Sequence, residues 1–451
     1  MNTQLSTFTI AAIIIGLSVG VAATPYTSKF SAGFEQFLQS KRQTHKAFSE
    51  KNEALFAKSL KQDWRTFKQA LVKKNKPGLK PRIQPVRNTH SNGAEAVSSS
   101  AATKPVQPLP VSRGFYGYAV PPPPLTTPFK EYFGQSQQSI VDYRQYFILH
   151  PDFTILSEYF EFLQKRYTRD FWAGLKLSTF LCGQMLKRKN SINLCSWILM
   201  HGQLLDVRLA QAKADLYLLV ASKQGWLNAP YFEIANTNLY MINTQQYLLK
   251  GSPPLSIHFK AHPNAQHSMF IRPSMGLLPA NKNRQIFKVH DLDEIIHLDL
   301  DHVRYLNDLP LLPISAYLND KLPLYLYKQL KAIGYFIPST MSKKQYVVHL
   351  LKWLQSLPYA TDEVQFGKEK PMTFSQLLYF PANDCEDRVY ALAAMLRGIY
   401  PAEVAALEYV GHLSAAVKIG PKWLEADPTY LGAGLGARQS AYKNAQPIWH
   451  Y

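Results

Sequence analysis

The sequence predicts an α+β protein with more than one domain. Apolar residues recur at helical spacing through residues 152–205, short alternating segments follow over residues 216–303, and helical spacing then returns before two final strands. This order of helices, strands, helices and strands differs from the regular alternation of a βαβ protein. At 451 residues, with 46% hydrophobic and 13% aromatic residues, the chain is long enough for two or three domains and a substantial buried core.

The N-terminus has the features of an export signal. An apolar run over residues 8–23 ends in Val21-Ala22-Ala23, and it is too short and too weakly flanked for a comfortable transmembrane span. Only the α-amino group supplies the positive charge that normally precedes such a run. We expect residues 1–23 to be a signal peptide and the protein to be periplasmic, secreted or associated with the cell envelope. The alternative is an uncleaved N-terminal anchor.

Two segments of unusual composition follow the signal. Apolar residues at three- and four-residue steps predict a basic amphipathic helical arm over residues 24–74. Residues 28–90 carry 15 Lys and Arg against 4 Asp and Glu, out of a formal net charge of +19 for the chain. Residues 75–128, with "GAEAVSSSAATKPVQPLP" and "AVPPPPLTTP", are too rich in Pro, Ser and Ala to bury a core, so we expect a disordered linker.

The charge of residues 28–90 suggests an anionic partner, such as an envelope polymer or a lipid surface. A solvated helix face with a solubilising linker explains the same charge equally well. Nucleic acid is not favoured, because no recognised reader motif accompanies the charge.

The globular part is expected to comprise a mixed helical and β region over residues 129–320 and a core over residues 321–451. Asn236-Thr237-Asn238 is the expected turn of a hairpin in the first region. Cys182 and Cys195 flank a predicted helical hairpin, where a disulfide and two buried free thiols are both compatible with the sequence. In either case Cys385 remains unpaired, because the chain has three cysteines.

Cys385 stands at the start of a predicted apolar helix in "YFPANDCEDRVYALAAML". Asp384 occupies the N-cap position and Asp387 lies three residues later, as in a capping box. The free backbone N–H groups at a helix start favour a thiolate, but Asp384, Glu386 and Asp387 oppose it. A reactive Cys385 therefore needs a histidine partner.

Two later motifs provide the other members of a catalytic triad. His412 begins a strand in "GHLSAAVKIG", and Asp427 follows the next strand in "KWLEADPTY". Adjacent antiparallel strands would bring the carboxylate beside the imidazole, where it would orient the ring. Nucleophile, base and orienting group thus occur in the chain order Cys, His, Asp.

These motifs resemble those of exported bacterial transglutaminase-like proteins. The resemblance rests on "YATDEVQFGKEKPMTFSQLLYFP", "NDCEDRVYALAAMLR" and "GHLSAAVKIGPKWLEADPTYLGAGLG", and extends more faintly over residues 150–440, including the helical segment "SWILMHGQLLDVRLAQAKADLYLLVAS". It implies a papain-like core, in which a helix bearing the cysteine packs on an antiparallel sheet bearing His and Asp. The matching triad residues are Cys385, His412 and Asp427.

The sequence also suggests roles for other polar residues. The backbone N–H of Cys385 would be one oxyanion donor, with Gln365 or Tyr379 as candidates for the second. In "EIIHLDLDHV", His297, Asp299 and Asp301 would share one strand face, a possible metal site but also the ordinary pattern of a half-exposed strand. Arg388 and Tyr390 are assigned to the helix surface. We expect no cofactor and no metal.

The predicted function is thiol-dependent acyl transfer, most simply hydrolysis of an amide or peptide bond by a cysteine peptidase or amidase. A protein or peptide is the expected substrate. With an amine in place of water as acceptor, the same chemistry gives a cross-linking transferase. Two other classes remain open: a non-catalytic binding module with the same fold, and a surface-assembly factor that acts through the basic arm.

Overall fold

The computed structural model describes residues 82–84, 114–242, 256–260, 264–265, 267–277, 284–288, 295–333 and 341–451. The predicted signal peptide, residues 1–23, and the predicted basic arm, residues 24–74, lie outside these ranges and stay predictions. Among the described residues, no helix is both long enough and apolar enough to cross a membrane.

Four helices begin the described globular part, where helical spacing predicted them. They are α2 (Gln137–Ile148), α3 (Phe153–Tyr167), α4 (Phe171–Met185) and α5 (Lys189–Leu199), followed by the short 3₁₀ helix η1 (Met200–Gln203). Asp170 caps α4 by accepting a hydrogen bond from the backbone N–H of Ala173 at 2.8 Å. A disulfide joins Cys182 of α4 to Cys195 of α5, which decides between the two states that the sequence left open.

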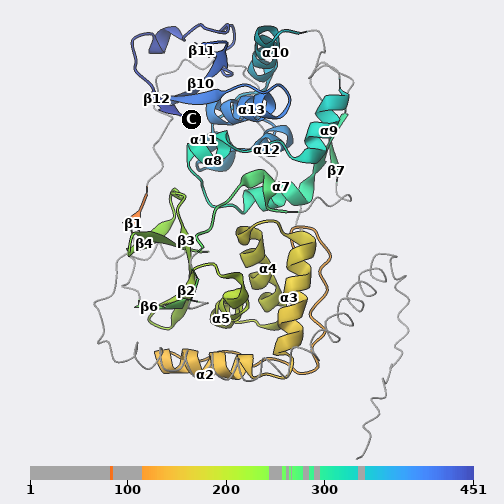
Figure 1. The fold of residues 1–451 in the computed structure, drawn as a ribbon, viewed down its shortest axis with the longest axis vertical. Coiled ribbons are helices and arrows are strands. Elements are labelled where there is room, and N and C mark those ends of the chain that lie inside the picture. The colour runs from red at the N-terminus through yellow and green to blue at the C-terminus, as the bar shows by residue number, and fades with distance from the viewer. Residues whose placement is uncertain are drawn as a thin grey trace, which may run out of the picture. The chain divides into compact units, whose positions relative to one another are not determined.

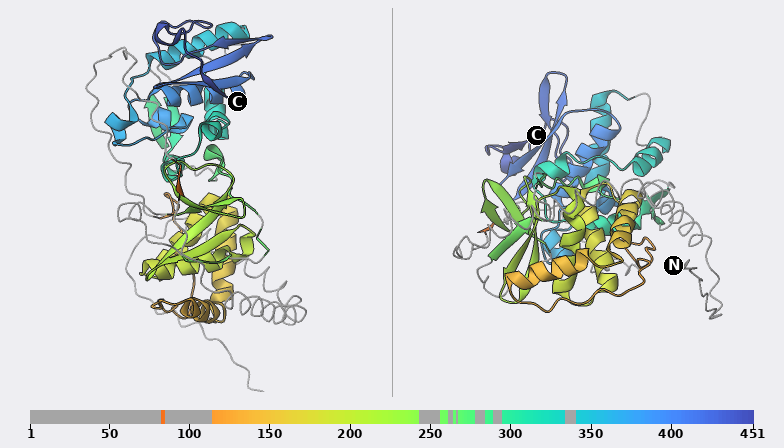
Figure 2. Two further views of the ribbon diagram at one scale, coloured as in Figure 1. Left: turned by 90° about the vertical axis from the view of Figure 1, so that its left-hand side faces the viewer. Right: turned by 60° about the horizontal axis from the view of Figure 1, so that its bottom comes forward.

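An antiparallel sheet has six strands, of which β1 precedes these helices in the sequence and the other five follow them. Its strand order is β1-β4-β5-β3-β2-β6. The bounds are β1 (Arg82–Ile83), β2 (Val207–Ala212), β3 (Asp215–Ser222), β4 (Pro230–Ile234), β5 (Thr237–Met241) and β6 (Ser256–Lys260). Helix α5 packs on β2 and β3, and Leu219, Phe232 and Leu239 belong to the apolar core of the sheet. Figure 2 shows the green strands of this sheet beside the yellow helices.

Two details of this sheet differ from the sequence-based expectation. The β4–β5 turn is formed by Ala235 and Asn236, whose φ angles are 49° and 60°, so that Thr237 already belongs to the strand. Strand β2 lies in a segment expected to be helical. Its alternating residues pair with β3 around a turn in which Lys213 has a φ of 53°. Residues 216–222 of β3 are buried on both faces of the sheet, and this burial overrides the helical pattern of the segment.

Part of the segment expected as a disordered linker is ordered. The end of the range 75–128 packs on the helices, with Phe115, Tyr118 and Val120 buried. The ring of Tyr118 lies 4.7 Å from that of Tyr167. Aromatic side chains in this Pro-rich stretch bury against apolar helix surface, which composition averaged over the whole segment does not reveal.

The predicted strand "EIIHLDLDHV" ends earlier than expected. Strand β8 (Ile295–Asp299) pairs with β7 (Arg284–Lys288), and helix α7 (Leu300–Asn307) begins directly after it. Asp299 accepts hydrogen bonds from the backbone N–H groups at the start of α7, while Asp301 pairs with Arg304. Asp301 is therefore helical and does not share a strand face with His297, because capping by Asp299 terminates the strand. Residues 267–273 lie in the range in which we expected short strands, but they form isolated bridges and lead into the 3₁₀ helix η2 (Pro273–Met275).

The C-terminal part combines helices with a four-stranded antiparallel sheet (Figure 1). The helices are α8 (Ile314–Leu318), α9 (Leu324–Ala332), α10 (Lys343–Ser356), α11 (Asp362–Phe366), α12 (Phe374–Tyr379) and α13 (Cys385–Gly398). The strands β9 (Val404–Tyr409), β10 (His412–Ile419), β11 (Lys422–Glu425) and β12 (Ile448–His450) occur in the order β11-β10-β9-β12. Helix α13 packs on β9, β10, α8, α10 and α12.

Small residues allow the close packing of α13 on the sheet. Ala405 and Ala416 face each other across β9 and β10, as do Ala406 and Ala415, and all four are buried. Residues 385–396 of α13 are buried throughout, so this helix lies in the core of the C-terminal part. The described chain is thus α+β, as its order of elements predicted.

Candidate active site

Cys385 is the first residue of α13. The capping box predicted from the sequence is present, with the backbone N–H of Asp384 donating to the Asp387 carboxylate at 3.1 Å. Cys385 is also the free thiol of the chain, because its other two cysteines form the disulfide. Its side chain is 1% exposed.

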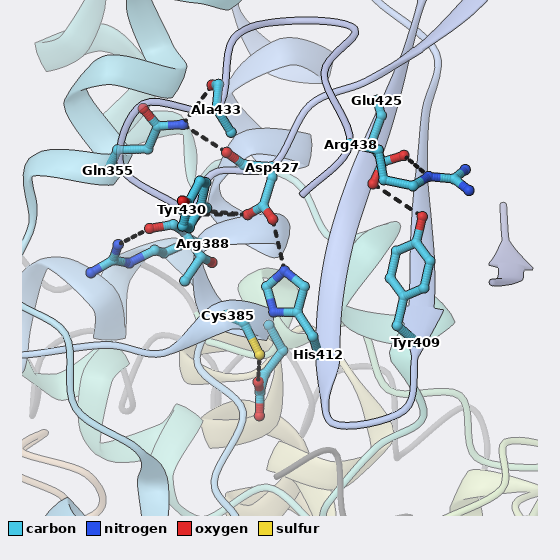
Figure 3. Close-up of polar contacts among 12 residues, drawn as sticks. Gln355, Cys385, Arg388, Tyr409, His412, Glu425, Asp427, Tyr430, Ala433 and Arg438 are labelled. Atoms are coloured by element: carbon cyan, nitrogen blue, oxygen red, sulfur yellow. Dashed lines mark hydrogen bonds and ion pairs between the residues drawn. The ribbon is translucent and has the colours of Figure 1, made fainter. Parts of the chain in front are cut away.

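His412 and Asp427 meet as the strand order predicted. A tight turn at Gly411, whose φ is 79°, joins β9 to β10, and His412 is the first residue of β10. The β10–β11 ladder continues to Ala426, whose N–H donates to the carbonyl of Ala415 at 2.7 Å, and this carries Asp427 toward the beginning of β10. The Nε2 atom of His412 lies 2.8 Å from Oδ2 of Asp427 (Figure 3).

The orientation of Asp427 is set by further hydrogen bonds. Its Oδ1 accepts from the backbone N–H groups of Thr429 at 2.8 Å and Tyr430 at 3.2 Å. Gln355 of α10 donates through Nε2 to the carbonyl oxygens of Asp427 at 2.8 Å and Ala433 at 3.0 Å (Figure 3). Burial would raise the pKa of Asp427, but the hydrogen bonds from His412, Thr429 and Tyr430 hold it below its ordinary value.

The second ring nitrogen of His412 faces the sulfur of Cys385 (Figure 3). Burial would lower the pKa of His412, yet hydrogen bonding to Asp427 and to Cys385 raises it to about 10. The three side chains therefore lie in a row, with the carboxylate on one ring nitrogen and the thiol at the other. This is the arrangement that general base catalysis by a histidine requires.

Glu386 competes with His412 for the thiol. The Sγ atom of Cys385 donates to Oε2 of Glu386 at 3.1 Å. Burial and the Glu386 carboxylate raise the pKa of Cys385, and His412 acts in the opposite direction. Burial and Glu386 thus oppose the thiolate, so a reactive Cys385 requires that Glu386 no longer accept the hydrogen bond of the thiol.

Two tyrosines that the sequence-based reasoning missed complete the surroundings of His412. The ring of Tyr442 stacks on the imidazole with 5.4 Å between centroids and an interplanar angle of 13°. Tyr442 in turn stacks on Tyr409, whose hydroxyl donates to Glu425 at 3.0 Å. A ring stacked on a protonated imidazole stabilises its charge and excludes water from the His412–Asp427 pair. No motif marks Tyr442, which reaches the site only because the chain folds back before β12.

Neither candidate for the second oxyanion donor is directed at the thiol by its contacts. The amide nitrogen of Gln365 donates to the carbonyl of Ala360 at 3.0 Å. Tyr379 packs on Phe380, and burial raises its pKa while the positive charge of Arg304 lowers it. The role of both residues stays a prediction.

Tyr359, unlike Gln365 and Tyr379, has an electrostatic interaction with Cys385. Burial and then the charge of Cys385 raise the pKa of this tyrosine. An isolated parallel bridge pairs Tyr359 with Asn383, two residues before Cys385. Tyr359 is the first residue of the motif "YATDEVQFGKEKPMTFSQLLYFP", and this position was the signal that could have identified it. Its pairing with Asn383 brings it beside the start of α13.

Arg388 and Tyr390 are buried, so their assignment to the helix surface is wrong. Arg388 donates through Nε to Oδ1 of Asn383 at 2.6 Å and through a terminal nitrogen to the carbonyl of Leu357 at 2.7 Å. Tyr390 stacks on Tyr317 of α8 at 5.1 Å. Helical periodicity could not identify a hydrophilic face here, because α13 is enclosed on all sides.

A cluster of carboxylates, all buried except the half-buried Glu369, surrounds the start of α13. Ligand atoms of Asp362, Asp384 and Asp387 lie within 4.8 Å of one another, as do those of Asp362, Glu369 and Glu386. Burial, followed by the neighbouring carboxylates, raises the pKa values of Asp384, Glu386 and Asp387 well above their ordinary range. Either group of three has the oxygen donors that a hard divalent cation prefers, a ligand set not recognised from the sequence.

Comparison with known proteins adds no family to these observations, since no family model, curated protein or solved structure matches the chain. The resemblance of its motifs to transglutaminase-like proteins stays an expectation. Function is therefore inferred from the chemistry of Cys385, His412 and Asp427.

Proposed function

We propose that this protein is an exported thiol-dependent acyl-transfer enzyme that hydrolyses an amide or peptide bond. The observation that carries the proposal is the row of Cys385, His412 and Asp427, with 2.8 Å between Nε2 of His412 and Oδ2 of Asp427. A cysteine helix against an antiparallel sheet with His and Asp is the arrangement expected for a papain-like core of transglutaminase-like type. The disulfide between Cys182 and Cys195 supports an oxidising compartment such as the periplasm or the extracellular space.

In the active form one proton is shared between Cys385 and His412, and it lies on the ring nitrogen of His412 that faces the sulfur, as the raised pKa of His412 favours. The sulfur of Cys385 then bonds to the carbonyl carbon of the amide. The carbon–nitrogen bond then breaks, and the same proton goes to the departing amine. Water attacks the thioester with His412 as base, which releases the acid and restores the thiol. Asp427 stabilises the imidazolium and fixes the orientation of the ring. The backbone N–H of Cys385 is available for the oxyanion.

Labelling with iodoacetamide tests this proposal, because a single free thiol simplifies the result. We expect one label per native molecule, no label in Cys385→Ala, and slower labelling in His412→Ala. Amide-hydrolysing activity against a fluorogenic peptide library should disappear in Cys385→Ala. A native thiol that does not react at any pH at which the fold persists would contradict the proposal.

A non-catalytic binding module is the second candidate. The 1% exposure of Cys385 and its contact with Glu386 favour this alternative, because both keep the thiol from a substrate. It predicts that Cys385→Ala retains the phenotype of the wild type in the native host. A surface-assembly role through the basic arm predicts instead that deletion of residues 24–128 abolishes function, whereas the Cys385 variant retains it.

A further inference from the structure

Three basic side chains border a cavity of about 540 Å³. Neither Cys385 nor His412 belongs to its lining. Lys223 follows β3, Arg272 precedes η2, and Lys321 follows α8. All three are exposed, and no acidic side chain of the described residues forms an ion pair with them. Cationic groups from three separate segments thus converge on one concave surface.

Hydrogen bonds hold the first wall of this cavity in shape. The buried amide of Gln224 donates to the carbonyl of Ile271 at 2.9 Å and accepts from the N–H of the same residue at 2.7 Å. Ser222 donates to the carbonyl of Met269 at 3.0 Å. Segment 269–272 is therefore fastened along the end of β3, and Lys223 and Arg272 are carried by a fixed frame.

The second wall is equally well anchored. Asp320 accepts hydrogen bonds from the backbone N–H of Ser274 at 3.0 Å and from its hydroxyl group. This is the acidic side chain of the lining, and burial raises its pKa to about 6. Against this one carboxylate, the three cations give the lining a net positive charge.

Apolar surface accompanies the charge. Phe270 and Met275, both in the lining, are 56% and 47% exposed. Small-molecule sites combine apolar lining with a few polar or charged groups, and these two side chains supply the apolar part. A volume of about 540 Å³ falls within the range of small-molecule sites.

We infer that this cavity binds a small soluble anion, a carboxylate, sulfonate or phosphate carried on an apolar body. Lys223, Arg272 and Lys321 would hold the charged group, and Phe270 and Met275 would contact the apolar part. A membrane surface is the less suitable partner, since lipid binding uses an extended basic face and these cations surround a hollow. The inference is independent of the proposed acyl transfer, because it concerns binding alone.

The test uses 1-anilinonaphthalene-8-sulfonate, whose fluorescence rises when its aromatic rings enter an apolar site. We expect saturable binding to the full chain at one site and competition by inorganic phosphate. The triple variant Lys223→Ser, Arg272→Ser, Lys321→Ser should bind at least about tenfold more weakly, a loss of about 1.4 kcal/mol or more. The matched control Lys328→Ser, Lys331→Ser, Lys422→Ser removes three exposed cations outside the cavity and should bind like the wild type.

A second variant tests whether the probe binds in the cavity itself, because it fills the cavity without removing a charge. Ser315→Trp leaves all three cations in place but fills the cavity from α8. It should also weaken binding while the far-ultraviolet circular dichroism and the thermal unfolding midpoint stay those of the wild type. Equal affinity of the wild type and the triple variant would overturn the inference. The inference would also be overturned if the protein bound phosphatidylglycerol vesicles through these three side chains but did not bind the soluble probe, because the occupant would then be a lipid surface.

Discussion

Helices α7 and α13 begin in the same way, and one of them carries a candidate active site. At α7, Asp299 accepts from the backbone N–H groups of Asp301 at 3.0 Å and His302 at 3.2 Å. At α13, Asp384 and Asp387 form a capping box. Both starts are acidic and buried, although the sequence predicted a helix start at Asp384 and a continuing strand at Asp299.

The partners of the two helix starts differ. Asp301 of α7 pairs with Arg304 of the same helix. The thiol at the start of α13 meets His412, which comes from β10, and behind it Asp427, which follows β11. A capped helix start becomes a candidate active site only when other elements bring reactive groups to it. Among the described residues, this is seen at the start of α13.

The largest expected contrast is in activity. Asp427→Asn should lower the rate of amide hydrolysis by about 10²- to 10⁴-fold, because an amide neither stabilises the imidazolium nor holds the required tautomer. Asp299→Asn at α7 should leave the rate within about twofold of wild type, since no reacting group touches it. Turnover of a fluorogenic peptide library measures both. Comparable losses in the two variants would break the distinction between the helices.

The second contrast is in stability. Arg388→Met should lower the free energy of unfolding by about 3 kcal/mol, because the buried acceptors Asn383 and Leu357 lose their donor. Arg304→Met should cost less, since its pairing with Asp301 lies within one helix. Urea unfolding at pH 7 gives both values. A loss below about 1 kcal/mol for Arg388→Met would show that its hydrogen bonds are not important to the core.

The third contrast is in pH dependence, and it has opposite signs at the two sites. Burial lowers the pKa of His302 to about 4, so the unfolded state binds the proton more readily and stability falls as the pH drops from about 6.5 toward 4. For His412, with its pKa raised to about 10, the contribution is fully present below pH 6.5 and is lost as the pH rises toward 10.

Urea unfolding across pH 4 to 10 tests this pair of signs. His302→Phe should flatten the acidic side of the stability profile, by up to about 3 kcal/mol from the size of the shift. His412→Phe should flatten the alkaline side. If His302→Phe changed the stability above pH 6.5, or His412→Phe changed it on the acidic side, the environments described for these two histidines would be wrong.

The smallest expected effect concerns the caps themselves. Asp299→Ala should cost about 1 kcal/mol, the usual value for loss of an N-cap side chain. Thermal unfolding of this variant, compared with the exposed-site control Lys328→Ala, measures the cost. A change much above 2 kcal/mol would mean that Asp299 does more than cap α7.

Much of the site could be anticipated from local sequence. The capping box of α13, the turn at Gly411 and the strand that carries His412 each depend on a few neighbouring residues. Strand β8 was predicted too long, because the acidic cap Asp299 ends it four residues before the end of the expected strand. Tyr442, Tyr359 and Arg388 were missed because their partners come from distant parts of the chain.

By itself, the sequence determined the α+β order of elements, the cap that places Cys385 at a helix start, and the sequential order of Cys385, His412 and Asp427. These features follow from backbone geometry and periodicity over a few residues. Tertiary structure alone decided that Glu386 holds the thiol, that Tyr442 covers the imidazole, and that Arg388 is buried. Such contacts depend on how separate elements converge, and burial then sets the charge state of each group.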